Sequence, residues 1–111
     1  MDRKEKLLEI QCPVALVQTV LGGKWKILIM WRLKDGVRRF NELQKSLPSI
    51  RQSSLTKELR ELEVDGLIRR EVYKEVPPKV EYSLTDIGEN FLKVILGMGE
   101  WGLQYSNFLK S

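Results

Sequence analysis

The sequence contains no histidine and only one cysteine, Cys12, among its 111 residues. The lack of histidine excludes serine–histidine and cysteine–histidine triads, histidine acid–base catalysis and histidine metal sites. A single cysteine excludes an intramolecular disulfide, a CxxC redox pair and a cysteine-rich zinc site, although it can still pair with the thiol of a second chain. We therefore expect no metal site and no cofactor. We also expect no enzyme, since one thiol without histidine could act only as a thiol peroxidase-like centre, and no pattern supports one.

Long apolar segments are also missing. No run approaches the ~20 residues that span a bilayer, and the N-terminal segment lacks the apolar core of a signal peptide. The composition, 42% hydrophobic and 31% charged, is that of a folded globular domain, and no linker, repeat or low-complexity segment divides it. We expect a single domain, over about residues 7–109, that is cytoplasmic and binds no membrane.

The net charge of +4 is concentrated in the middle of the chain. Residues 22–84 hold fourteen basic and nine acidic side chains, whereas residues 1–21 are neutral overall and residues 85–111 carry a net charge of −1. A basic centre between neutral ends is typical of an anion-binding unit such as a nucleic-acid-binding domain. Because excesses of this size are common, charge alone does not decide the function.

The first half of the chain is predicted to be helical. Pro13 suits the first position of a helix that Gly22-Gly23 ends, and a second helix is expected from about 24 to 33. Residues 37–40 form a brief extended piece. Asn41 and Gln44 then have the spacing of a capping pair and begin a short helix that reaches about residue 46.

The second half combines helix and strand. A helix over about 52–65 is followed by two strands, 67–73 and 80–84, on either side of a Pro77-Pro78 turn. Thr85 caps a final helical run, which Gly97 and Gly99 weaken. This order predicts an α+β, mostly helical fold: a winged helix-turn-helix, with a wing over about 67–84.

The helix at 52–65 is the candidate recognition helix. Leu55, Leu59 and Leu62 share one face at helical spacing, which indicates the side that packs on the core. The opposite side is polar and cationic, and its length and width suit a DNA major groove. We expect residues 52–60 to read bases there, with Lys57 and Arg60 donating to guanine edges. Gln52, Ser53 and Ser54 are expected to bind bases or phosphates near the helix start.

The wing and the short strand add further cations. Lys74 and Lys79 are expected at the tip of the wing, where they would meet the adjacent minor groove or the DNA backbone. Arg38 and Arg39 suit either a phosphate contact or an exposed edge strand, and these two interpretations stay open.

A series of motifs extends over about residues 12–102 and carries a family resemblance. The chain resembles HxlR-type winged-helix transcriptional regulators, a bacterial family whose architecture is related to that of MarR-type regulators. The matching segments are Cys12-Pro13, Gly22-Gly23-Lys24-Trp25, Arg39-Phe40-Asn41-Glu42-Leu43, Leu55-Thr56, Leu59-Arg60-Glu61-Leu62-Glu63, Asp65-Gly66-Leu67-Ile68, Pro77-Pro78-Lys79-Val80-Glu81-Tyr82 and Leu84-Thr85.

The resemblance implies a homodimer that binds double-stranded DNA at an operator with two related half-sites. Such proteins usually repress a nearby gene and sometimes activate one. The terminal helices, over about 7–21 and 86–109, would form the dimer interface, since their apolar content exceeds what so small a core needs. The alternative, that these segments close the core of the monomer, stays open.

Arg51 departs from the family pattern. Members generally place a small polar residue there to cap the recognition helix, whereas an arginine side chain cannot accept a hydrogen bond from the free N–H groups of the first turn. Arg51 is a candidate phosphate contact instead, and Ser49 or Ser53 is a candidate cap.

Cys12 has two interpretations. Several family members use a cysteine at this place to sense oxidants or electrophiles, through an inter-subunit disulfide or thiol modification. A sensing thiol needs positive charge nearby, for which Lys4, Lys6, Lys24 and the first turn of the helix at Pro13 are candidates. Alternatively, Cys12 is a small apolar side chain packed at the dimer interface, and a small-molecule effector binds elsewhere.

Trp25, Trp31 and Trp101 are expected to be core residues, because each lies on an apolar helical stretch. An alternative function is a winged-helix protein-interaction module that uses its basic face for an acidic partner. DNA binding would differ from that alternative in its steep salt dependence and sequence preference.

Overall fold

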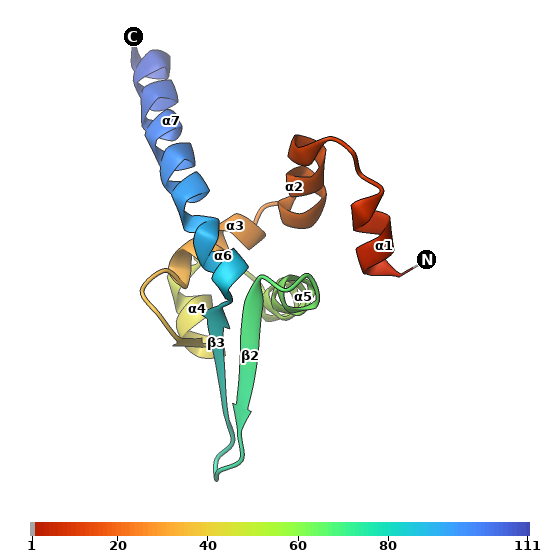
Figure 1. Ribbon diagram of the computed structural model, residues 1–111. Coiled ribbons are helices and arrows are strands. Elements are labelled where there is room, and N and C mark those ends of the chain that lie inside the picture. The colour runs from red at the N-terminus through yellow and green to blue at the C-terminus, as the bar shows by residue number, and fades with distance from the viewer. Residues whose placement is uncertain (1) are drawn as a thin grey trace.

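The computed structural model describes residues 2–111, and Figure 1 shows a helical body from which a ribbon and one long helix project in opposite directions. Five short helices, a thirteen-residue helix and a nineteen-residue helix alternate with three strands in this described part. In chain order the elements are α1 (Arg3–Leu8), α2 (Pro13–Leu21), α3 (Lys26–Arg32), β1 (Arg38–Arg39), α4 (Phe40–Ser46), α5 (Gln52–Val64), β2 (Ile68–Tyr73), β3 (Lys79–Leu84), α6 (Asp86–Asn90) and α7 (Leu92–Lys110).

The core lies among α3, α4, α5 and the base of the sheet. Leu55, Leu59 and Leu62 are all buried, as the helical spacing predicted for the inner face of α5. They pack in one cluster with Ile29 and Met30 of α3. Full burial of such a side chain contributes about 1.5–3 kcal/mol to stability, so this cluster positions α5 firmly against the body.

The sheet has three antiparallel strands in the order β1-β3-β2. The β2–β3 ribbon is in register from Ile68 opposite Leu84 to Tyr73 opposite Lys79. β1 adds Arg38 opposite Tyr82 and Arg39 opposite Glu81. The ribbon is therefore longer than the two-residue strand beside it, and its far end projects from the body as a wing (Figure 1).

The start of α4 differs from the prediction. The helix begins at Phe40, and the backbone N–H of Arg39 donates to the Glu42 carboxylate at 2.8 Å. Asn41 is therefore inside the helix and does not cap it. The reason is that β1 pairs with β3 through Arg39, which ends the extended segment one residue before Phe40.

The expected N-terminal segment, about 7–21, is not one continuous helix. α1 ends at Leu8 and α2 begins at Pro13. Proline restricts the preceding residue to extended backbone, and Cys12 has φ −81° and ψ 116°. The segment therefore forms two helices with Cys12 at their junction.

The final helix is longer than its glycines suggest. Thr85 caps α6 as predicted, since its hydroxyl accepts from the Gly88 N–H at 3.2 Å. After Phe91, α7 continues without a break through Gly97 and Gly99 to Lys110. α7 also contains Gly102, and the three glycines together cost the helix about 1.5–3 kcal/mol, which burial of the apolar residues around them can offset.

α7 carries the largest departure from the expected core. Trp101 is 63% exposed, so the prediction that all three tryptophans are core residues is wrong for this one. Trp25 and Trp31 are partly buried against the core cluster, in agreement with the prediction. The periodicity of apolar residues is the same whether a side chain packs within its own chain or against another, which is why the pattern did not separate these cases.

The shape of the chain is elongated. Its radius of gyration is 15.7 Å and its extents are 55 × 38 × 24 Å, whereas a compact chain of this length has a radius of gyration of about 13 Å. Its accessible surface is 8210 Å², against roughly 6,300 Å² for a compact monomer of this mass. Within residues 2–111, no single helix is long and apolar enough to cross a membrane, although α2 and α3, bent by 79° relative to one another, pass the same test as a pair.

Candidate nucleic-acid interface

The outer face of α5 is a cationic and polar surface. Thr56, Lys57 and Arg60 are exposed, as are Gln52 and Ser53 at the start of the helix, and Ser54 is half-buried. A shallow hollow on this face is lined by Gln52, Ser53, Thr56, Lys57, Arg60 and Glu61. Leu55, Leu59 and Leu62 on the opposite face of the helix are buried in the core. This packing fixes the rotation of α5, so its polar side faces solvent.

The first turn of α5 has free backbone donors. Arg51 occupies the N-cap position with extended backbone, and among residues 2–111 no side chain caps this helix. The expectation that Ser49 or Ser53 caps the helix is therefore wrong: Ser49 lies in the left-handed region at φ 73° in the turn between α4 and α5, and Ser53 lies inside the first turn of α5. The N–H groups at the start of a helix favour anions, so this end of α5, with the exposed Arg51 beside it, suits a phosphate.

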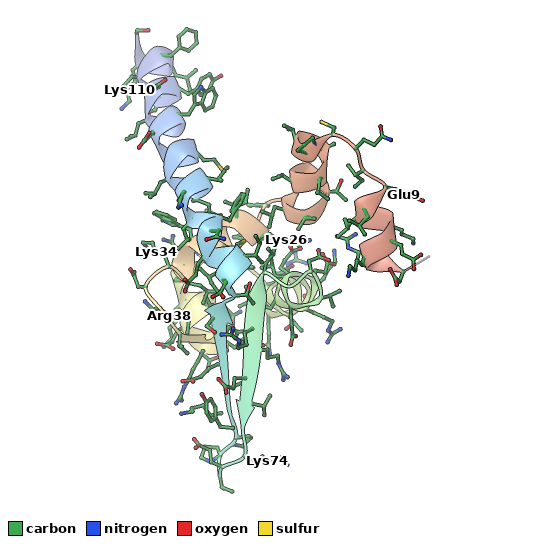
Figure 2. The ribbon with its side chains drawn as sticks, in the orientation of Figure 1. Glu9, Lys26, Lys34, Arg38, Lys74 and Lys110 are labelled. Atoms are coloured by element: carbon green, nitrogen blue, oxygen red, sulfur yellow. The ribbon has the colours of Figure 1, made fainter. Side chains whose placement is uncertain are left out.

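An ion pair fixes α5 against α3. Lys26 is buried, and its Nζ lies 2.6 Å from a Glu61 carboxylate oxygen and 3.8 Å from one of Glu58. Figure 2 shows Lys26 at the point where α3 and α5 approach. The hydrogen bond from Lys26 lowers the pKa of Glu61 from its ordinary value of 4.5. Glu61 also lies 4.0 Å from Lys57, which remains mostly exposed.

Replacing Glu61 with Gln is expected to lower the free energy of unfolding at pH 7 by about 1 kcal/mol or less, because the Glu61 side chain is partly exposed and its charge is screened. A carboxyl whose pKa is lowered by folding stabilises the protein above its unfolded pKa, and that contribution is lost as the pH falls through the folded pKa. The difference between wild type and E61Q should therefore be full at neutral pH and shrink below about pH 4.5.

Urea titrations at a series of pH values measure this difference. Glu63→Gln is the matched control, since Glu63 is exposed on the same helix. A difference between wild type and E61Q that is independent of pH, or one that E63Q reproduces, would contradict the assigned ion pair.

The two wing lysines have different surroundings. Lys74 is exposed and lies at the tip of the wing (Figure 2). Lys79 is the first residue of β3, and its Nζ lies 4.4 Å from the centroid of the Tyr73 ring and 4.0 Å from Glu81. Lys74 is thus the more accessible of the two cations, whereas the Lys79 side chain contacts Tyr73 and Glu81 on the ribbon.

Tyr73 is bound to acidic neighbours on the same ribbon. Interactions of its hydroxyl with Glu81 and Glu71 raise the pKa of Tyr73 to about 12. The Tyr73 hydroxyl donates to Glu71 Oε2 at 3.1 Å. This side of the ribbon therefore carries two carboxylates and a neutral phenol beside the Lys79 ammonium, so the charge of Lys79 is partly balanced within the wing.

The arginines of β1 lie at an edge of the sheet. Arg39 is exposed and pairs in register with Glu81. Arg38 is half-buried, and its guanidinium donates to the Val37 carbonyl at 3.0 Å. Of the two, Arg39 is the more accessible candidate for a phosphate.

Sequence reasoning missed two arginines on β2. Arg69 and Arg70 are both exposed, and Arg70 lines a second hollow together with Arg60 of α5. The signal that could have found them is the alternation of the strand. Because Ile68 is buried, Arg70 has to lie on the same face of the sheet, next to α5.

Cys12 is exposed at the N-cap position of α2. The thiol therefore lies beside the positive end of a helix, which was one of the expected sources of positive charge. Three lysines were also expected as sources of positive charge near the thiol. One of them, Lys24, has its Nζ 4.9 Å from the centroid of the Trp25 ring. Lys4 and Lys6 are exposed on α1.

α1 is attached to the C-terminal end of α5. The Arg3 guanidinium donates two hydrogen bonds to the Asp65 carboxylate, both at 2.9 Å. Asp65 is the C-cap residue of α5, and its side chain is only 3% exposed. The segment that precedes Cys12 is therefore linked directly to α5.

Comparison with known proteins gives a consistent result over nearly the whole chain. The model of the HxlR-like helix-turn-helix family matches residues 20–109. The HTH-type transcriptional regulator YdeP of Bacillus subtilis is 54% identical over 96 residues, which are 86% of this chain and 75% of YdeP. YybR of the same organism, also an HTH-type transcriptional regulator, is 50% identical over 100 residues, which cover 90% of this chain and 80% of YybR.

Solved structures agree with this similarity. The redox regulator HypR in its reduced form superposes with a TM-score of 0.84 at 49% identity, covering 90% of this chain and 99% of HypR. The reduced form of the transcriptional regulator YodB from B. subtilis gives a TM-score of 0.76 at 36% identity, covering 86% of this chain and 95% of YodB.

Proposed function

Since this chain belongs to the HxlR-like helix-turn-helix family, and is therefore a DNA-binding transcriptional regulator and not an enzyme, we propose that it acts in the cytoplasm as a homodimer. The dimer binds a double-stranded operator with two related half-sites and represses a nearby gene. Each subunit reads one half-site through α5.

The observation that carries this proposal is the division of α5 into two faces. Its leucines are buried in the core, and the opposite face presents Lys57 and Arg60 to solvent together with hydroxyl and amide side chains. Cations and hydroxyls on one face of a rigid helix suit hydrogen bonding to base edges in the major groove. Arg51, the free N–H groups of the first turn and Lys74 on the wing would dock on phosphates.

The exposed apolar surface supports a homodimer. Trp101, Tyr105 and Phe108 form a ladder of stacked rings along α7, with centroids 5.2 Å and 5.9 Å apart. Figure 1 shows α7 standing clear of the body. An apolar groove between α2, α6 and the start of α7 lies nearby, lined by Leu16, Val17, Val20, Leu21, Leu67, Ile87, Asn90, Phe91 and Val94. A second copy covers both surfaces, since apolar area of this extent is costly to leave in water.

Dimer symmetry predicts the form of the operator. A two-fold axis relates the two copies of α5, so the half-sites have to be inverted repeats. For both helices to enter the same side of the duplex, the half-site centres should be about 34–36 Å apart, one helical turn of DNA.

Fluorescence-anisotropy titration across a salt series tests the function. The DNA fragments are the region upstream of the protein's own gene and a scrambled version of it. Tighter binding to the upstream fragment that persists at high salt supports a sequence-specific regulator. Equal, weak binding that disappears with salt would contradict specific recognition of this fragment. An absence of any binding would favour the alternative of an acidic protein partner for the basic face.

We also propose that Cys12 senses oxidants or electrophiles. Two solved structures to which this chain is similar are described as a redox regulator, HypR, and as diamide-treated YodB. In this chain, Cys12 is exposed beside the N-terminus of α2 and close in sequence to the α1 segment bound to α5. With one cysteine per chain, oxidation by a diamide or peroxide would join Cys12 of both subunits, or an electrophile would alkylate the thiol.

Cys12→Ser should abolish the response of DNA binding to oxidant while leaving the affinity of the reduced protein within about twofold, because Cys12 is exposed and lies far from the reading face in sequence. The measurement is anisotropy before and after diamide, together with non-reducing electrophoresis for a disulfide-linked dimer. An oxidant response that persists in the serine variant would overturn the sensing role.

A further inference from the structure

A second cationic hollow lies at the junction of the recognition helix and the wing. It is lined by Thr56, Leu59, Arg60, Glu63, Arg70 and Tyr82. Thr56, Arg60 and Glu63 succeed one another at spacings of four and three residues along one flank of α5, the flank that faces the sheet. Arg70 comes from β2, where it is in register with Tyr82 of β3.

The two arginines in this hollow lack carboxylate partners. Within residues 2–111, no Asp or Glu oxygen lies within 4.0 Å of the guanidinium of Arg60 or of Arg70. Both side chains are exposed, and Glu63 is the one acidic residue that lines the hollow. Two guanidinium groups that line one hollow without a paired carboxylate make it suited to a negatively charged group.

The position of the hollow relative to DNA indicates which anion it meets. If α5 lies in the major groove and the wing over the adjacent minor groove, the sugar–phosphate backbone that separates the two grooves runs across their junction. Arg70 lies at that junction, at the base of the wing and well before the tip at Lys74. A planar guanidinium with paired N–H groups matches the oxygens of a phosphate.

We propose that Arg70 binds a backbone phosphate of the operator in this hollow and is a further DNA-contacting residue, with Arg60 on the other wall raising the local positive potential. This inference rests on the proposed function, because it requires that α5 enter the major groove. Arg70 contacts no base, so it contributes affinity and orientation without sequence preference.

The chain supplies a matched control in the preceding residue. Arg69 has the same charge, is also exposed on β2 and pairs with Ser83, but strand alternation places it on the opposite face of the sheet, away from α5. Arg70→Ala should weaken binding to the native and scrambled fragments by a similar factor of roughly tenfold and reduce the salt slope by about 1. Arg69→Ala should change affinity by less than about twofold.

Anisotropy titrations of wild type, R69A and R70A over a salt series make the comparison, and thermal unfolding shows that each variant is folded. Arg70→Gln, which keeps part of the side-chain stem, replaces R70A if the alanine variant unfolds. Equal losses for the two positions, or a loss in R70A on the native fragment alone, would overturn the phosphate assignment. A wild-type protein that binds no DNA would overturn the proposed function itself, and this inference with it.

Discussion

Trp101→Glu is expected to convert the proposed dimer into a monomer and to weaken binding to the two-half-site operator by a factor of about 100 or more. Trp101 is 63% exposed in the single chain, and it is the first of the three stacked rings on α7, next to Tyr105. If a second subunit covers this stack, a carboxylate there becomes buried without a partner, which is strongly unfavourable. A monomer then binds each half-site separately and loses the gain from linking the two binding events.

Sedimentation equilibrium gives the oligomeric state, and anisotropy gives the affinity. Asn107→Glu is the matched control, because it adds the same charge to an exposed polar position on the same helix, away from the ring stack. A Trp101→Glu variant that remains dimeric with wild-type affinity would show that α7 does not form the interface.

Arg60→Ala is expected to weaken binding to the native operator by roughly 10- to 100-fold, or about 1–3 kcal/mol, with a smaller loss on scrambled DNA. The expected cause is the loss of a bidentate contact to a base edge, since Arg60 is exposed on the outer face of α5 and lines the hollow there together with Gln52 and Lys57. Stability should change little because the side chain is exposed and makes no ion pair within 4.0 Å among residues 2–111.

Arg60→Lys separates charge from geometry in the same assay. Lysine keeps the positive charge but cannot form the planar bidentate contact, so the variant should retain binding to scrambled DNA and lose much of the preference for the operator. If Arg60→Ala binds the operator as tightly as wild type does, Arg60 is not a base-reading residue.

The architecture could be predicted from the sequence wherever one chain buries its own apolar residues. Leu55, Leu59 and Leu62 identified both the inner face of α5 and, by opposition, its outer face. The helix expected over about 52–65 is α5, Gln52–Val64, and Gly66 beyond its C-cap adopts the left-handed φ of 79°. In each case a local pattern and the tertiary packing demand the same conformation, which makes sequence reasoning reliable there.

Features that depend on neighbours distant in sequence were not predictable in the same way. The exposure of Trp101 depends on whether a second chain is present, and the α4 cap at Glu42 depends on how β1 pairs with β3. The Lys26–Glu61 pair joins residues 35 positions apart, so no local pattern marks it. The position of Arg70 was predictable only in part. Strand alternation predicts which face of the sheet it lies on, but not that it lines the same hollow as Arg60.

The central claim is that two copies of α5 read two half-sites of one operator. Selection of bound duplexes from a pool of randomised DNA by the wild-type protein tests it most directly. The account predicts enrichment of an inverted repeat whose half-site centres are about 10–11 base pairs apart, one turn of the helix. Sequences that show no enriched motif, or a single half-site without its inverted copy, would contradict it.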